Sequence, residues 1–394
     1  MSAPPDVLLF TIDAGGGHRA AARALAAAAE ETGTPFRLQV ESFQQVLIRL
    51  DVLQRLTGLS LEGAYNAILR QHLNAAMAPL LRLMHAGIRA RRGAIVRELA
   101  RWLGERPRPV AVVSVMPNFN GIMKRALEAA HPGVPLIVVL TDLADFPPRF
   151  WIEPGVDRIV VGTDEAATQA VVLGVPRERV TRVSGMVLHP RFYRSLGQDT
   201  RERVRAELAL APDDFAVLLL FGGKGSPELQ PVTERLLATG AAARVIAVCG
   251  DNPALYARLA PLEARHPGQL LRLGFTDRVA ELLAASDLLV TKPGPGSLSE
   301  AFQLRVPVVV TRNVHTIPQE RFNTDFVRER GLGLVVGHWR EIPAAVERLR
   351  CAPAERAAMR ERLATLPPNR AVYEVLEAIA REAGTTWAAP RVPL

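Results

Sequence analysis

Short apolar runs that alternate with helical patterns constrain this fold most, and the alternation occurs twice along the chain. The run Val7–Ile12 leads into three glycines and an Ala-rich helix expected from about Arg19 to Glu30. Strands that alternate with helices are typical of parallel sheets covered on both faces. Further strands of this first half are expected at Arg37–Val40, Val110–Val115, Leu136–Leu140 and Arg158–Val161.

The pattern restarts at Phe215–Phe221, which runs into Gly222, Gly223 and Lys224. Between the halves, an Arg/Glu helix and a Pro-Asp-Asp turn place the boundary near residue 195. A chain of 394 residues also favours two domains. We predict two α/β domains, residues 1–195 and 196–370, and a C-terminal helix and tail, 371–394, that packs back on the first. Later strands are expected at Arg244–Cys249, Leu270–Leu273, Leu288–Thr291 and Val306–Val310.

The composition narrows the protein class. Hydrophobic residues make up 48% of the chain, enough for a sizeable core. The two cysteines, Cys249 and Cys351, form no Cys-x-x-Cys motif, which fits a reducing cytoplasm. No apolar run reaches about 18 residues, and the segment Met1–Ile12 lacks the features of a signal peptide. The net charge of +8 indicates an anionic partner: nucleic acid, a phosphate ligand or a membrane surface.

A helical region over about residues 42–110 interrupts the alternation. From Arg82 to Arg108 it carries eight arginines against Glu98 and Glu105, interleaved with apolar residues. Two interpretations stay open: an interfacial helix on anionic lipid, or a core-packing helix with a solvated basic face. Nucleic acid is disfavoured, because aromatic residues make up only 5% of the chain and do not interleave with the basic ones.

Glycine-rich turns after two strands are candidate phosphate or transition-state sites. The turn Asp13–His18 joins a strand to a helix N-terminus, whose N–H groups attract anions. His18 would point into a cleft from there, or would be an ordinary polar helix cap. The turn Phe221–Pro227 repeats the geometry in the second half, without the spacing of a Walker A loop.

A third such turn, Thr291–Glu300, leads into a helix expected to begin near Ser297. Free N–H groups and the helix dipole would favour a diphosphate there. Glu300 would accept hydrogen bonds from ribose hydroxyls, or would form a capping box with Ser297. The eight histidines form no close pair at metal-ligand spacing, and no Gly-x-Ser-x-Gly motif occurs. We therefore expect neither a metal nor a covalent mechanism.

Taken together in order and spacing, these motifs resemble family 28 glycosyltransferases of the GT-B fold over about residues 6–340. The nearest resemblance is to the branch of monogalactosyldiacylglycerol synthases and diacylglycerol glucosyltransferases, and a more distant one is to the N-acetylglucosaminyltransferase that completes lipid II. It implies two Rossmann-like domains whose parallel sheets face a central cleft. The motifs that carry it are Asp13–Ala20, Val138–Leu143, Val161–Ala166, Gly185–Phe192, Cys249–Asn252, Gly274–Thr276, Ala285–Asp287, Lys292–Glu300 and Ile317–Glu320 with Asn323.

The resemblance implies that the C-terminal domain holds a UDP-sugar. Phe275 and Thr276 would contact uracil, and Glu300 the ribose. The other donor residues implied are Gly296 and Ser297 for the phosphates, Gln319 and Glu320 for the sugar hydroxyls, Gly222, Gly223 and Lys224 near the diphosphate, and Gly294 and Asn323 within the same nucleotide-sugar site.

The N-terminal domain would then bind the acceptor, with His18 facing the reacting centre. Glu41 stands where the family has an acid thought to act as base, usually Asp. The chain also departs from the family where Ser114–Asn118 lacks the histidine of a Ser-x-His-Pro motif. The remaining residues implied on the acceptor side are Gly16, Gly17, Asn118 and Asp142.

The implied activity is inverting transfer of a hexose from a UDP-sugar to a lipid acceptor such as diacylglycerol. The enzyme would need no cofactor and would lie peripherally on the inner, cytoplasmic face of the cell membrane. The alternatives are a transferase acting on a lipid-linked cell-wall precursor or a small soluble acceptor, a UDP-N-acetylglucosamine 2-epimerase, and a nucleotide-sugar sensor without activity.

Overall fold

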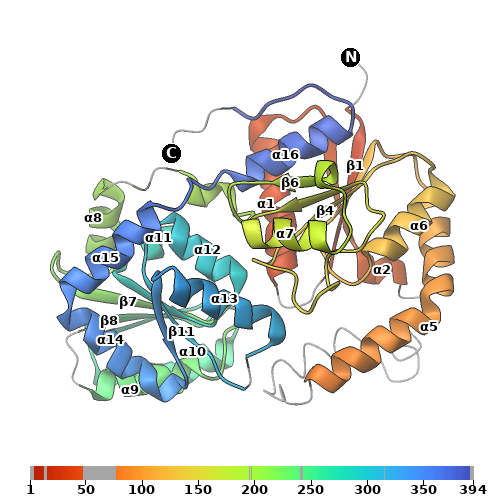
Figure 1. Cartoon of the computed structure of the whole chain (residues 1–394). Coiled ribbons are helices and arrows are strands. Elements are labelled where there is room, and N and C mark those ends of the chain that lie inside the picture. Colours follow the sequence, from red (N-terminus) through yellow and green to blue (C-terminus); the bar gives the residue numbers. More distant parts are fainter. Residues whose placement is uncertain are drawn as a thin grey trace. The chain divides into compact units, whose positions relative to one another are not determined.

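The computed structural model describes residues 4–12, 16–47, 77–194, 196, 198–239, 243–314 and 316–390. Its chain forms two compact units (Figure 1). Unit 1 comprises residues 1–190, 317–319 and 369–392, and unit 2 comprises 191–316, 320–368 and 393–394. The expected boundary near residue 195, the start of the first glycine-rich turn (13–15) and residues 48–76 of the expected helical region lie outside the described residues.

Unit 1 is built on a parallel six-stranded sheet with the order β2-β1-β3-β4-β5-β6. The inner strands β1, β3 and β4 are apolar and buried, as expected for a parallel sheet covered on both faces. The strands are β1 Asp6–Thr11, β2 Arg37–Ser42, β3 Ala111–Ser114, β4 Leu136–Val139, β5 Arg158–Val161 and β6 Val180–Arg182.

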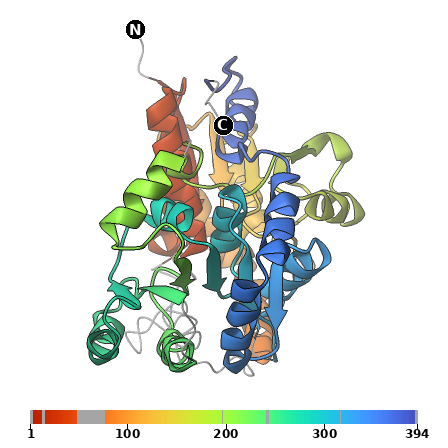
Figure 2. The same ribbon diagram turned by 90° about the vertical axis from the view of Figure 1, so that its left-hand side faces the viewer.

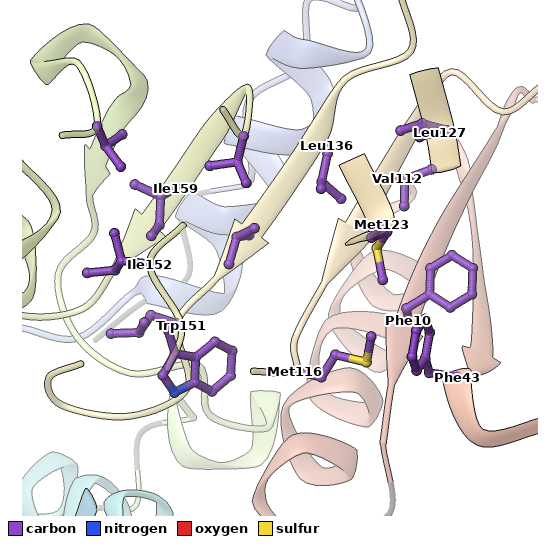
Figure 3. Packing of buried hydrophobic residues seen from close by; sticks show 14 of the residues in the cluster. Phe10, Phe43, Val112, Met116, Met123, Leu127, Leu136, Trp151, Ile152 and Ile159 are labelled. Atoms are coloured by element: carbon purple, nitrogen blue, oxygen red, sulfur yellow. The ribbon is translucent and has the colours of Figure 1, made fainter. Parts of the chain in front are cut away.

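Helices cover this sheet, and its core includes Phe10, Met116 and Trp151 (Figure 3). The C-terminal helix α16 returns to unit 1 and packs on α1 (Figure 2). Its apolar face is buried, as the high helical amphipathicity of this segment indicates. The helices of unit 1 are α1 Gly17–Thr32, α2 Phe43–Leu47, α5 Met77–Gly104, α6 Asn120–Ala130, α7 Asp164–Val172 and α16 Ala371–Glu382, with short 3₁₀ turns at Arg177–Arg179 and Pro190–Phe192.

Unit 2 repeats the architecture with the parallel order β12-β11-β10-β7-β8-β9. Its strands are β7 Phe215–Leu220, β8 Ala243–Val248, β9 Leu270–Leu273, β10 Leu288–Thr291, β11 Val308–Thr311 and β12 Gly333–Val336. Its helices are α8 Gln198–Glu207, α9 Leu229–Ala238, α10 Pro253–Arg265, α11 Val279–Ala285, α12 Pro295–Gln303, α13 Pro318–Glu329, α14 Ile342–Cys351 and α15 Pro353–Ala364, with a 3₁₀ turn at Trp339–Glu341.

Each sheet reverses its strand order next to its first strand. In unit 1 the chain adds β2 on one side of β1 and then β3 on the other; in unit 2 it adds β8 beside β7 and later β10 on the opposite side. Ligands of open α/β sheets bind outside the carboxyl ends of the strands at such a reversal. The loops after β1 and β3, and those after β7 and β10, are therefore the places to search for function.

The α/β class with two parallel sheets is confirmed. Two short strands at the sheet edges were missed, β6 and β12: β6 carries a weak apolar signal, and β12 is apolar but only four residues long. The helix expected near Ser297 begins two residues earlier, at Pro295. Helix α5 ends at Gly104, so the last residues of the basic segment 82–108 lie beyond the helix.

Helix α5 packs on the core of unit 1 through one face. Leu99 and Leu103 are completely buried, which stabilises the fold by roughly 1.5–3 kcal/mol for each side chain. The exposed arginines Arg89 and Arg97 lie outside this buried face. The core-packing interpretation of the basic segment is thus correct for residues 95–103, and it leaves the interfacial interpretation of the exposed face untested. No helix in the described part of the chain is long and apolar enough to cross a membrane.

Candidate functional site

The loop between β10 and α12 is held rigidly at the strand reversal of unit 2. The N–H of Gly294 donates to the carbonyl of Lys292 at 2.7 Å, and Asn323 Nδ2 donates to the carbonyl of Pro293 at 2.8 Å. The N–H of Leu298 donates to the carbonyl of Gly294, and the helix N-cap has no side-chain hydrogen bond. The N–H groups of Gly296 and Ser297, in the first turn, therefore lie before the first helical hydrogen bond and can bind an anion.

Gly296 has room for a ligand. A Cβ atom added there would meet no described heavy atom within 4 Å, and its φ angle does not lie in the left-handed region. Neither packing nor backbone strain therefore requires glycine at this position. The close approach of a ligand to the N–H groups of α12 would explain the residue.

Glu300 lies in the second turn of α12, and burial raises its pKa to about 7, with Arg191 acting in the opposite direction. The alternative of a capping box with Ser297 is wrong, because the N-cap is Gly294 and Ser297 is already the third helical residue. The carboxyl group of Glu300 therefore does not cap the helix and can bind another partner, as the predicted contact with ribose hydroxyls requires.

The other predicted donor residues follow the carboxyl ends of the strands of unit 2. Phe275, after β9, keeps 70% of its surface exposed, which is unusual for a large aromatic side chain. Gly222, just after β7, has φ 85° and needs the freedom of glycine. Burial raises the pKa of Glu320, in the first turn of α13, and the charge of Lys292 opposes the rise. Gln319 precedes it, Gly223 and Lys224 are exposed in the turn after β7, and Thr276 Oγ1 accepts a hydrogen bond from the N–H of Arg278.

At the strand reversal of unit 1, His18 is the second residue of α1, after Gly16 as the left-handed N-cap and Gly17. Its Nδ1 lies 3.1 Å from Thr141 Oγ1, and its ring centroid lies 5.5 Å from that of Trp151. Burial lowers the pKa of His18 to about 4, although a hydrogen bond to the Val115 carbonyl acts in the opposite direction. The imidazole is therefore neutral at pH 7, the form that can accept a proton.

Trp151, quoted only as part of a motif, proves to be central to this region. Its Nε1 donates to Asp142 Oδ2 at 2.7 Å, so the predicted acceptor residue Asp142 fixes the indole that lies against His18. The side chain is completely buried (Figure 3). An aromatic residue shortly after a Thr-Asp pair was the signal that the sequence offered.

Asp145 organises the loop that carries Trp151, a role that was not predicted from the sequence. Its carboxylate is inaccessible to solvent and accepts hydrogen bonds from the N–H groups of Arg149 and Trp151, at 2.8 and 2.7 Å. Burial raises its pKa, and these backbone donors oppose the rise. A single aspartate in a loop gives no sequence signal for such a role.

Asn118 and Glu41 complete the residues predicted on this side. Asn118, after β3, adopts the left-handed φ of 70°, and its N–H donates to the carbonyl of Phe150 at 2.8 Å. Nearby Asn120 is buried and donates to the Trp151 carbonyl at 2.9 Å. Glu41 lies at the carboxyl end of the edge strand β2, opposite Phe10 of β1. The described residues contain no group of three His, Cys, Asp or Glu side chains that could hold a metal ion.

The fold is that of the GT-B glycosyltransferases. The structure of HepE from Anabaena, solved in complex with UDP and glucose, matches 96% of this chain and 99% of its own, with a TM-score of 0.56 and 17% identity. Other structures of this fold class match with similar coverage. No family model matches the sequence.

Within that class, the chain is a homologue of the diacylglycerol glycosyltransferases, which confirms the resemblance to family 28. A probable monogalactosyldiacylglycerol synthase 2 from Oryza sativa subsp. indica is 29% identical over 371 residues, 88% of this chain and 74% of the relative. The processive diacylglycerol beta-glucosyltransferase of Bacillus subtilis is 28% identical over 250 residues, 63% of either chain.

Proposed function

We propose that this enzyme transfers a hexose from a UDP-sugar to the hydroxyl group of a diacylglycerol-type lipid. The observation that carries the donor half is the open site at the strand reversal of unit 2. There the free N–H groups of α12, the carboxyl group of Glu300 and the exposed ring of Phe275 can serve diphosphate, ribose and uracil. The names of the homologues support the lipid acceptor.

The transfer inverts the anomeric carbon in one displacement. The acceptor oxygen attacks C1 of the sugar, the bond from C1 to the β-phosphate oxygen breaks, and UDP leaves with that electron pair. The hydroxyl proton passes to a base, for which His18 and Glu41 are the candidates. Help from a positioned base contributes roughly 10²–10⁴-fold to the rate. The N–H groups of Gly296 and Ser297 stabilise the charge that grows on the diphosphate, without a metal.

UDP release tests the proposal. The enzyme is incubated with UDP-glucose, UDP-galactose or UDP-N-acetylglucosamine, each with and without diacylglycerol in detergent micelles. We expect UDP release with at least one sugar, dependent on the lipid. Epimerised sugar without an acceptor would instead indicate the 2-epimerase, and UDP binding without release on any acceptor would indicate a sensor. A soluble aglycone that replaced the lipid fully would overturn the lipid acceptor.

We further propose that the exposed face of α5 docks on the anionic cytoplasmic surface of the membrane. Several arginines of the segment have partners within the protein: Arg101 pairs with Glu98, and Arg106 lies 3.3 Å over the Trp102 ring. The attraction therefore rests on fewer residues than the sequence indicates, chiefly Arg89 and Arg97, which are exposed. Each basic residue near such a surface contributes about 1 kcal/mol.

Liposome flotation tests this docking. The double variant Arg89→Glu/Arg97→Glu should float less than the wild type with vesicles of phosphatidylglycerol and phosphatidylcholine at low salt. The double variant Arg258→Glu/Arg265→Glu, at two exposed positions of α10 in unit 2, reverses the same number of charges and serves as the control. Equal flotation of all three proteins would overturn the role of α5.

A further inference from the structure

Lys292 is the first residue after β10 and stands at the strand reversal of unit 2, yet the sequence analysis gave it no role of its own. The strand before it, β10, is hydrogen-bonded to β7, and Gly222 lies two residues after the end of β7. A Cβ atom added to Gly222 would lie 3.4 Å from Lys292 Cε and 3.8 Å from Nζ. The side chain thus crosses from one loop of the reversal to the other.

The backbone around Lys292 is fixed from three directions. Thr291 Oγ1 donates to the carbonyl of Leu220 at the end of β7, at 2.6 Å. The carbonyl of Lys292 accepts from Gly294, and that of Pro293 accepts from the buried Asn323. Because the loop is held in this way, little backbone entropy remains to be lost when the side chain engages a ligand.

The electrostatics of this position call for an anion. A lysine before the first turn of a helix places its charge beside the positive end of the helix dipole, which is unfavourable for a cation. A Cβ atom added to Gly294 would lie 3.9 Å from Lys292 Cε and 3.8 Å from Glu320 Oε1, and the charge of Lys292 opposes the rise in the pKa of the Glu320 carboxyl that burial causes. Lys292 itself remains exposed to solvent. A phosphate group between the ammonium of Lys292 and the N–H groups of α12 would compensate both the charge of the lysine and the positive end of the helix dipole.

We infer that Lys292 binds the diphosphate of the donor, with its ammonium on the β-phosphate that becomes the leaving group, and that Lys224 is not the principal cation of this site. The inference rests on the proposed function, because it assumes a uridine diphosphate at the N-terminus of α12. It differs from the sequence prediction, which placed Lys224 near the diphosphate. Both lysines are exposed, but the side-chain atoms of Lys292 lie beside Gly222 and Gly294, in both loops of the reversal.

Calorimetric titration with uridine, UMP and UDP separates the contribution of each phosphate. Lys292→Met should weaken UDP binding about 10- to 100-fold, since hydrogen bonds to charged groups contribute about 1.5–3 kcal/mol. The affinity for UMP should fall less than the affinity for UDP. Uridine should bind the variant as tightly as it binds the wild type, which would also show that the variant is folded. Lys292→Arg should recover most of the UDP affinity.

Two further variants sharpen the result. Arg265→Gln removes one positive charge from unit 2 at the C-terminus of α10, just before the edge strand β9 and so at the amino ends of the strands, away from the site, and should leave all three affinities unchanged. Lys224→Met should cost less UDP affinity than Lys292→Met. Wild-type UDP affinity in Lys292→Met, or a larger loss in Lys224→Met, would overturn the inference. If wild-type protein bound none of the three ligands, the proposed function itself would fail.

Discussion

The two strand reversals of this protein occupy the same place in their sheets but differ in what fills them. In unit 1, His18, Thr141, Trp151 and Asp142 contact one another, so the protein itself satisfies much of the polar surface. The helix that follows each reversal has a glycine N-cap without a side-chain hydrogen bond, but in unit 2 the aromatic residue Phe275 is largely exposed instead of packed against a neighbour. The difference fits the proposed division of roles, in which unit 1 supplies groups that are already in place and unit 2 binds the nucleotide sugar.

The largest expected effect tests whether unit 1 supplies the catalytic base and takes no part in binding the nucleotide. His18→Ala should lower kcat by about 10²–10⁴-fold, as expected for a lost general base, and should leave UDP affinity unchanged. Steady-state kinetics and calorimetry measure the two quantities. His266→Ala, on the surface of unit 2, is the matched control. If kcat stayed within a few-fold of wild type, Glu41 would become the better candidate for the base.

The preassembly of unit 1 is tested through its stability. Asp145→Ala leaves the N–H groups of Arg149 and Trp151 without their acceptor and should lower the free energy of unfolding by about 3 kcal/mol, since each unsatisfied buried group costs about 1–3 kcal/mol. Asp164→Ala removes a solvent-exposed ion pair with Arg182 and should cost less than about 1 kcal/mol. Urea unfolding monitored by tryptophan fluorescence measures both. Equal costs would show that the Asp145 loop is not preorganised.

Substitution of Phe275 tests whether its exposed ring binds the uracil base in unit 2. Phe275→Ala should weaken uridine and UDP binding alike, by about 5- to 100-fold, because stacking of a base on an aromatic ring contributes about 1–3 kcal/mol. Phe275→Tyr keeps the ring and should bind as the wild type does. Unchanged affinity in the alanine variant would mean that the exposed ring serves another surface, such as the lipid.

The smallest effect concerns pH. Burial raises the pKa of Glu300 to about 7, and ribose hydroxyls that donate to its carboxylate would lower that pKa on binding. Binding then favours loss of the proton, so uridine affinity should rise by up to about tenfold from pH 6 to pH 8. Uridine avoids the titration of the phosphate. Glu300→Gln should bind weakly at every pH and show no such rise; a slope that persisted in this variant would assign the titration to another group.

The sequence predicted the inner strands of the two sheets better than their edge strands. Inner strands such as β7 are continuous apolar runs of six residues, whereas β6 and β12 pair on one side only and are three and four residues long. The donor motif Lys292–Glu300 lies in one segment, so its arrangement followed from local chemistry. The proposed role of Lys292 depends on two loops that meet only in the folded sheet, and Asp145 binds backbone N–H groups of its own loop, which the sequence pattern does not display.

The position of α16 has a consequence for how the chain folds during synthesis. Unit 1 begins at the first residues and is completed by the last helix, so unit 2 is nearly an insertion within it. Because the apolar face of α16 is buried on unit 1, the ribosome must synthesise all of unit 2 and then α16 before that core is closed. A stop codon placed after unit 2 would therefore damage the distant N-terminal half, and cleavage near residue 368 should do the same to the mature protein.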